Sequence, residues 1–299
     1  MFMKIKILLL FSLVTSIIYS QPATEVYLFD FIQNDSIFTV DNPVNISENQ
    51  GYDNQPSFLN DGSGILFAST RSGQTDVVLY NLENKTRAWL TNTLGSEYSP
   101  MQTPNKKYFS AILLDTDETQ LLWLYPFNRK KPKVIIEDLA IGYHTWFHKF
   151  MVVYFVLGDP PTLEVSNLKY KIKYPIDKNI GRSLQLIPET RLISYISREE
   201  NEPEIYSIDP ITSEKKYITD ALSESQDLVW TNDGTIIMGK KDKLYKLKPG
   251  IDEDWVEFAS LEGYGLTGIT RLAISPLGNK IAIVVDEEVV KNKIINSND

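Results

Sequence analysis

Residues 55–92 read QPSFLNDGSGILFASTRSGQTDVVLYNLENKTRAWLTN. Their β-branched and aromatic residues gather in four short runs, and turn-forming Asn, Asp, Ser and Gly separate these runs. Such turn residues accept tight and positive-φ geometry, whereas β-branched and aromatic residues favour strands. The stretch therefore predicts four consecutive strands, at Gln55–Leu59, Ile65–Thr70, Asp76–Leu82 and Arg87–Thr91.

The same unit recurs along the chain with a nearly constant period. Taking the first turn residue as a landmark, we find it at Asn60, Pro104, His148, Pro188, Asn232 and Pro276. Successive spacings are 44, 44, 40, 44 and 44 residues. A four-stranded repeat of this length is typical of one β-propeller blade. A helical repeat is not expected, because the apolar runs are short and are separated by Gly, Pro and Asn.

The two ends of the chain predict how the ring closes. After Pro276 only one further apolar run, Lys280–Val285, precedes polar residues, whereas the N-terminal region has two spare runs, Glu25–Phe31 and Ser36–Thr39. Joining these runs in one sheet completes a sixth blade and leaves no open sheet edge. We therefore expect an all-β, six-bladed β-propeller with four antiparallel strands per blade. It would span residues 21–290, followed by a polar C-terminal tail at 291–299.

The repeat resembles that of the TolB-type propellers of bacterial envelopes. Pro56–Thr91 has the order NDG, ILFASTRSG, DVVLYNLEN and WLT, and residues 188–219 echo it with YISR, EIYSID and IT. The TolB-type repeat likewise runs from a turn to an apolar strand ending Ser-x-Arg, then Asp-Ile-Tyr-like and Leu-Thr. The resemblance implies a propeller that interacts with proteins in the envelope. It covers the propeller alone, because we find no separate N-terminal domain of the TolB kind in this sequence.

Residues 1–20 have the features of a secretory signal peptide. Lys4 and Lys6 precede an apolar run from Ile7 to Ile18, and small Ser20 precedes polar Gln21. The run is about a dozen residues, which is shorter than the ~20 that a membrane-spanning helix needs. We therefore expect a periplasmic or secreted protein with no stable membrane insertion after signal removal. A retained membrane anchor is the alternative.

The composition narrows the classes of partner. The chain has no cysteine, so disulfides and lipid attachment through a cysteine are excluded. Its net charge is −9, and the first twenty residues contain two lysines and no acid, so removal of the signal makes the protein more acidic. An acidic protein is repelled by phosphate backbones. We therefore expect a protein or peptide partner and no nucleic acid.

The predicted binding site lies where the innermost strand of each blade begins. Because strand residues alternate between faces, the residues five positions before each landmark should ring one mouth of a central channel. These residues are Gln55, Ser99, Tyr143, Ser183, Asp227 and Arg271. Aromatic and arginine side chains, which often anchor protein interfaces, occur at the entries between blades, at Tyr52, Tyr98, Tyr143, Arg182 and Tyr264. Asp227 and Arg271 come from adjacent blades and are also candidates to pair with each other.

Catalytic and metal motifs are weak in this sequence. His144 and His148 in HTWFH have the spacing of a zinc-protease helix, but Thr145 replaces the general-base Glu, and the segment is predicted as strand and turn. The acidic residues Asp115, Asp117 and Glu118 fit a solvated loop better than a Ca²⁺ site. No Gly-x-Ser-x-Gly nucleophile motif occurs. We expect no catalytic residues, no metal site and no cofactor, with Ca²⁺ the only candidate.

These observations favour a non-enzymatic, TolB-like β-propeller that acts as a protein- or peptide-binding scaffold in the bacterial envelope. One alternative is an enzyme, a metal-dependent hydrolase or lactonase working in the channel, although the predicted channel ring has Asp227 as its only carboxylate. Another alternative is a propeller that binds a glycan or small ligand, for which tyrosines would serve equally well.

Overall fold

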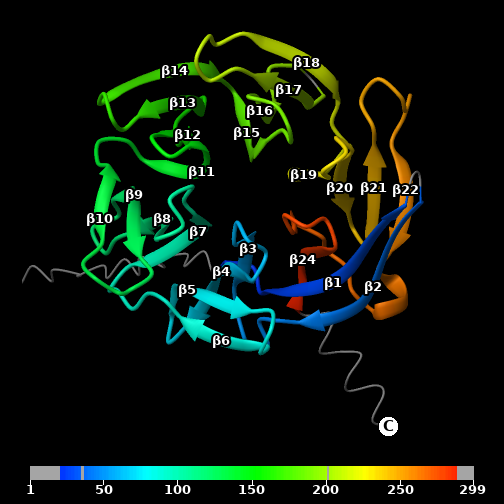
Figure 1. Ribbon diagram of the computed structural model, residues 1–299, viewed down its shortest axis with the longest axis horizontal. Helices are drawn as coiled ribbons and strands as arrows, with labels where there is room; N and C mark the ends of the chain where they lie inside the picture. Colours follow the sequence, from blue (N-terminus) through cyan, green and yellow to red (C-terminus); the bar gives the residue numbers. More distant parts are fainter. Residues whose placement is uncertain (1–20, 35–36, 201, 288–299) are drawn as a thin grey trace, which may run out of the picture.

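Six four-stranded antiparallel sheets form a ring in the computed structural model, which describes residues 21–34, 37–200 and 202–287 (Figure 1). The predicted all-β, six-bladed propeller with four strands per blade is confirmed. The predicted signal peptide and C-terminal tail lie outside the described residues. Within the described ranges, the helical segment η1 is a short 3-10 turn at Glu262–Tyr264, and no helix is long and apolar enough to cross a membrane.

Five of the blades are continuous in sequence. Blade 1 contains β3 (Asp53–Phe58), β4 (Gly64–Arg71), β5 (Gln74–Asn81) and β6 (Thr86–Trp89). Blade 2 contains β7 (Ser96–Gln102), β8 (Tyr108–Leu114), β9 (Gln120–Pro126) and β10 (Lys133–Ile136). Blade 3 contains β11 (Ile141–His148), β12 (Met151–Val156), β13 (Thr162–Asn167) and β14 (Ile172–Lys178). Blade 4 contains β15 (Ile180–Leu186), β16 (Ile193–Ser197), β17 (Glu204–Ile208) and β18 (Lys215–Asp220). Blade 5 contains β19 (Leu228–Trp230), β20 (Ile236–Lys240), β21 (Lys243–Leu247) and β22 (Val256–Ser260).

Blade 6 is built from both ends of the described chain. Its inner strands are β23 (Arg271–Ile274) and β24 (Lys280–Asp286), and its outer strands are β1 (Thr24–Asn34) and β2 (Ile37–Asn45). β1 pairs antiparallel with β24 without a register break, from Thr24 opposite Asp286 to Asp30 opposite Lys280. The predicted closure by the N-terminal strands is therefore confirmed.

Burial decreases from the second strand of a blade to its outermost strand. Every residue of β12 is buried, as is every residue of β16, whereas three of the four residues of β6 are exposed. The second strands are buried on both faces because each sheet packs between two neighbouring sheets, and the outer strands face solvent. This explains why the second strands appear in the sequence as continuous apolar runs instead of alternating ones.

The hydrophobic core is divided among the interfaces between blades. At the closure, Val26 and Ile46 from the N-terminal part of the chain pack with Phe67 and Val78 of blade 1 and with Val284 of β24. Burying side chains of this size stabilises the fold by roughly 1.5–3 kcal/mol each. The closure therefore rests on apolar packing as well as on strand pairing.

The shorter 40-residue spacing has a local cause. A single residue, Asn179, connects β14 to β15, with a backbone φ of 54°. The shortening therefore falls in the connection between blades 3 and 4, and both blades keep four strands. The ring stays regular because a connection between blades tolerates a change in length that a paired strand does not.

Candidate functional site

Most of the predicted site residues come together on the axis of the propeller. A small axial cavity is lined by Gln55, Ser99, Tyr143, Arg182, Ser183, Asp227 and Arg271, which belong to the innermost strands or directly precede them. The rings of Tyr52 and Tyr98 meet edge to face, with centroids 6.0 Å apart, beside this group. Tyr264 lies elsewhere, because its ring contacts Phe29 and its hydroxyl donates to Asp41 Oδ1 at 3.2 Å.

Part of this cluster is buried. Tyr52 and Arg271 are each 8% exposed, and Asp227 is 7% exposed. Burial raises the pKa of the Tyr52 hydroxyl above its usual range. Arg271 Nη1 lies 3.7 Å from Asp227 Oδ1, as expected for a pair from adjacent blades, and its guanidinium lies over the Tyr143 ring at 4.8 Å from the centroid. We call this group the channel floor: Gln55, Ser99, Tyr143, Arg182, Ser183, Asp227 and Arg271.

A repeated backbone irregularity shapes the floor. The pairing of β3 with β4 shifts between Asn54 and Ser57, and the pairing of β7 with β8 shifts between Tyr98 and Met101. Gln55 and Ser99, at equivalent places in these bulges, have φ values of 57° and 50°. The Ser99 backbone N–H donates to Gln55 Oε1 at 2.7 Å. Bulges re-aim side chains, and here they turn Gln55 toward the next blade.

The larger opening lies at the other ends of the innermost strands. Here a cavity of about 1020 Å³ is bounded by strand ends and by the landmark turns. We call it the wide mouth and define it by its aromatic and aliphatic residues Phe58, Trp146, Phe147, Phe150, Leu186, Trp230 and Ile274. Phe150 is 39% exposed and Leu186 is 42% exposed, so part of this apolar surface faces solvent.

Two tryptophans of the wide mouth are held by the preceding blade. Trp146 Nε1 donates to Ser110 Oγ on β8 at 2.9 Å, and Trp230 Nε1 donates to Ser194 Oγ on β16 at 2.8 Å. Both pairs are 36 residues apart in sequence. The same interaction between neighbouring blades therefore fixes both indole rings before any ligand arrives.

The two histidines have different surroundings. His144 is buried, its Nε2 lies 2.7 Å from Ser110 Oγ, and burial lowers its pKa to about 3. His148 is exposed at the last position of β11, where its Nδ1 accepts the backbone N–H of Phe150 at 3.2 Å. In the described part of the chain, no three His, Asp or Glu residues converge as metal ligands would.

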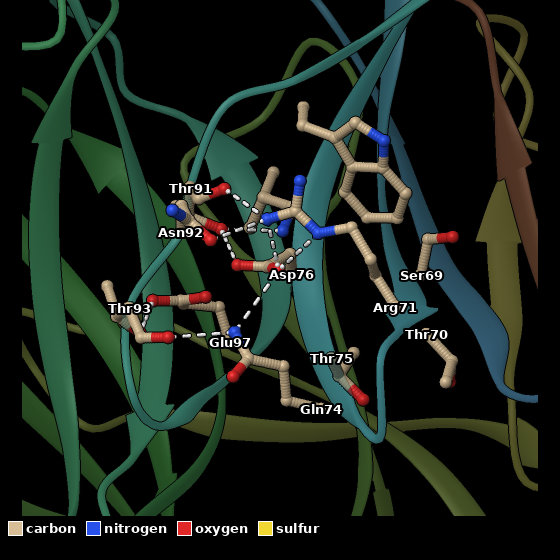
Figure 2. Close-up of polar contacts among 12 residues, drawn as sticks. Ser69, Thr70, Arg71, Gln74, Thr75, Asp76, Thr91, Asn92, Thr93 and Glu97 are labelled. Carbon is tan, nitrogen blue, oxygen red and sulfur yellow. Dashed lines mark hydrogen bonds and ion pairs between the residues drawn. The ribbon is translucent and has the colours of Figure 1, made fainter.

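The arginine and aspartate of the best repeat form an interaction inside blade 1 (Figure 2). Arg71 at the end of β4 donates to Asp76 Oδ2 on β5 at 2.7 Å, and Thr91 Oγ1 donates to Asp76 Oδ1 at 3.1 Å. The Arg71 guanidinium also lies over the Trp89 ring, 4.4 Å from its centroid. Asp76 is completely buried. These repeat residues therefore hold the outer strands of the blade together.

Comparisons with known proteins agree with this architecture. No family model and no curated protein matches the sequence. A solved structure assigned as TolB, from Agrobacterium tumefaciens, superposes with a TM-score of 0.68 at 12% identity, covering 89% of this chain and 99% of that one. This chain has a TolB-like propeller fold.

Two further solved structures match the propeller fold of this chain. TolB from Acinetobacter baumannii gives a TM-score of 0.56 at 10% identity, covering 89% of this chain and 64% of that one. A chain of the nidogen/laminin complex gives 0.62 at 7% identity, covering 80% of this chain and 94% of that one. At such identities the likeness establishes the fold of this TolB-like propeller and nothing about its ligand.

None of the residues that define the wide mouth was among the binding residues predicted from the sequence. Phe58, Trp146 and Trp230 pack in the hydrophobic core and also line the cavity. The signal in the sequence was the group of aromatics around one landmark, Trp146, Phe147 and Phe150. Sequence alone could not rank the two ends of the channel, because the size of each cavity depends on how side chains from six blades fill the axis.

Proposed function

We propose that this chain is an exported, non-enzymatic propeller that binds a protein or peptide partner at the wide mouth. The observation that carries the proposal is the solvent-open cavity of about 1020 Å³ with aromatic and aliphatic walls. Ligand sites are typically concave and largely apolar, with a few polar groups that fix orientation. Export rests on the signal-like residues 1–20.

The polar groups at the wide mouth suit a peptide. Ser57 and Gln185 line the cavity beside the apolar residues. A hydroxyl and an amide supply both donors and acceptors, which a peptide backbone needs. The fixed rings of Trp146 and Trp230 lower the entropy cost of ordering the site when the partner binds.

The charged groups at the wide mouth indicate which partner side chains it favours. Of the described residues lining this cavity, His148 and Lys149 are the titratable ones. Lys149 Nζ lies over the Phe150 ring at 4.8 Å from the centroid, which places a cation at the edge of the apolar surface. We therefore expect a partner segment that inserts aromatic or aliphatic side chains and carries an acidic residue beside them.

The proposal places the partner at the opposite end of the channel from the predicted rim. Of the ten predicted residues, seven line the floor cavity, and both Tyr52 and Tyr98 pack beside it. Tyr52, Ser183, Asp227 and Arg271 are buried there, which leaves little of their surface for a partner. The predicted tyrosine rim remains a separate hypothesis, which variants of Tyr98 would test.

The test selects peptides from a random library on the purified protein and measures their affinity by calorimetry. The test variant combines Phe150→Ser with Leu186→Ser, which removes exposed apolar surface from the mouth. The matched control combines Tyr170→Ser with Ile172→Ser, since these residues are 63% and 54% exposed on the outer part of blade 3. We expect the mouth variant to weaken selected peptides by at least about tenfold, which corresponds to about 1.4 kcal/mol.

The outcomes separate the competing functions. Peptides that bind the wild type and both variants equally would place the site elsewhere on the molecule. A glycan array that yields ligands where the peptide library yields none would assign the mouth to carbohydrate. In either case the peptide-binding proposal fails.

A further inference from the structure

The channel floor contains more positive than negative charge. Arg182 on β15 and Arg271 on β23 share one neighbouring carboxylate, Asp227. Asp227 is already engaged, because its Oδ1 faces Arg271 Nη1 and its Oδ2 accepts the backbone N–H of Leu272 at 3.1 Å. Two guanidinium groups and one carboxylate leave an excess of one positive charge on the axis.

Donor groups at the floor also lack acceptors. Arg182 Nη2 donates to the Thr270 carbonyl oxygen at 2.7 Å, but the buried Arg182 Nε has no hydrogen-bond partner within the described ranges. The buried Ser99 Oγ and Thr270 Oγ1 have none there either. Burial and the charge of Arg271 both lower the pKa of Arg182. An uncompensated cation in a largely buried place is costly, so an added anion would stabilise the arrangement.

The structure leaves room for that anion. A cavity of about 160 Å³ is lined by Arg182, Asp227, Thr270 and Arg271, and it adjoins the floor cavity of about 80 Å³ through the same two arginines. Glu224 is the one other charged residue among the described residues that line the cavity of about 160 Å³. Its Oε1 pairs with Lys240 Nζ at 3.2 Å. Glu224 is therefore already neutralised by a surface lysine.

We propose that Arg182 and Arg271 form a binding site for a single carboxylate group at the channel floor. The planar guanidinium matches a carboxylate through paired hydrogen bonds. One excess positive charge suits a monoanion, whereas Asp227 repels a dianion such as hydrogen phosphate. The site goes beyond the peptide-binding function and stands without it, because the floor and the wide mouth are defined by different side chains.

Arginine side-chain NMR tests the site directly. Acetate is the probe, and acetamide is its uncharged analogue of nearly the same shape. We expect acetate to shift the Arg182 Nε–H resonance saturably, with an apparent affinity about tenfold to a hundredfold above that of acetamide, as expected for a hydrogen bond to a charged group. The Arg182→Met variant identifies the resonance by its loss.

Three comparisons locate the site. Arg182→Met should lose acetate binding, while Arg191→Met, which removes the same charge from an exposed position between β15 and β16, should keep it. Lys149→Met should also keep it, because Lys149 lies at the wide mouth and not at the floor.

Each contrary result is decisive. Equal shifts with acetate and acetamide, or no shift with either, would overturn the proposal in the wild-type protein, whether or not Arg182→Met folds. Hydrogen phosphate binding more tightly than acetate would overturn the assignment to a monoanion. Loss of acetate binding in Lys149→Met would move the anion to the mouth.

Discussion

Asp53 makes the stability of this propeller depend on pH with an unusual sign. The residue is fully buried at the first position of β3, where blade 1 meets the closure. Its carboxyl pKa is raised from 3.8 to about 7, chiefly by burial and in smaller part by the neighbouring carboxyls of Glu25 and Glu287, against the opposing effect of hydrogen bonds from Ser69 and Asn49. Burial likewise raises the pKa of Glu25.

The magnitude follows from the difference between the two pKa values. One pKa unit corresponds to about 1.4 kcal/mol, so the shift of Asp53 represents roughly 4 kcal/mol. The folded state keeps a proton that the unfolded chain has released, so the contribution is fully present below about pH 4 and is lost as the pH rises through about 7. Asp53→Asn cannot ionise and therefore escapes this loss.

Urea unfolding followed by tryptophan fluorescence measures the effect at several pH values. We expect the free energy of unfolding of Asp53→Asn, taken relative to that of the wild type, to increase by about 4 kcal/mol between about pH 4 and about pH 8. Asp117→Asn is the control, because hydrogen bonds from Thr119 lower the pKa of that exposed carboxyl, so it stays ionised across this range and its difference from the wild type should not grow with pH. An Asp53→Asn advantage that does not grow with pH would refute the reasoning.

Three further predictions concern the repeat, the blade interfaces and the N-terminus. Arg71→Met leaves Asp76 buried without its cation and should lower the free energy of unfolding by about 3 kcal/mol, whereas Arg191→Met, at an exposed turn, should leave it unchanged in the same urea assay. Ser110→Ala removes the partner of both His144 and Trp146 and should lower the free energy of unfolding by about 2 kcal/mol. Ser194→Ala removes only the partner of Trp230 and should lower it by roughly half as much. Equal losses in the two variants would show that the contact with His144 contributes nothing. Mass spectrometry of the exported protein should find Gln21 as the first residue. The double variant Lys4→Glu with Lys6→Glu should accumulate as unprocessed precursor. An intact Met1 on the exported protein would contradict the signal peptide.

The repeat made the fold predictable, and its best-defined parts were the second strands. β4 and β24 lie within one residue of their predicted bounds, Ile65–Thr70 and Lys280–Val285, because strands buried on both faces must be continuously apolar. The bounds of outer strands were harder to predict: the strand expected at Arg87–Thr91 is Thr86–Trp89 in the structure. Solvent-exposed strands carry no apolar pattern that marks their ends.

The sequence by itself determined the number of blades, the closure by the N-terminal strands and the membership of the floor. These features follow from period and alternation, which are one-dimensional properties. Tertiary structure alone decided that the floor cavity is small and the cavity of the wide mouth large, that Tyr264 faces Asp41, and that Arg182 lacks a carboxylate of its own. Burial and charge balance depend on which side chains of six different blades share the axis, and no linear pattern records those distances.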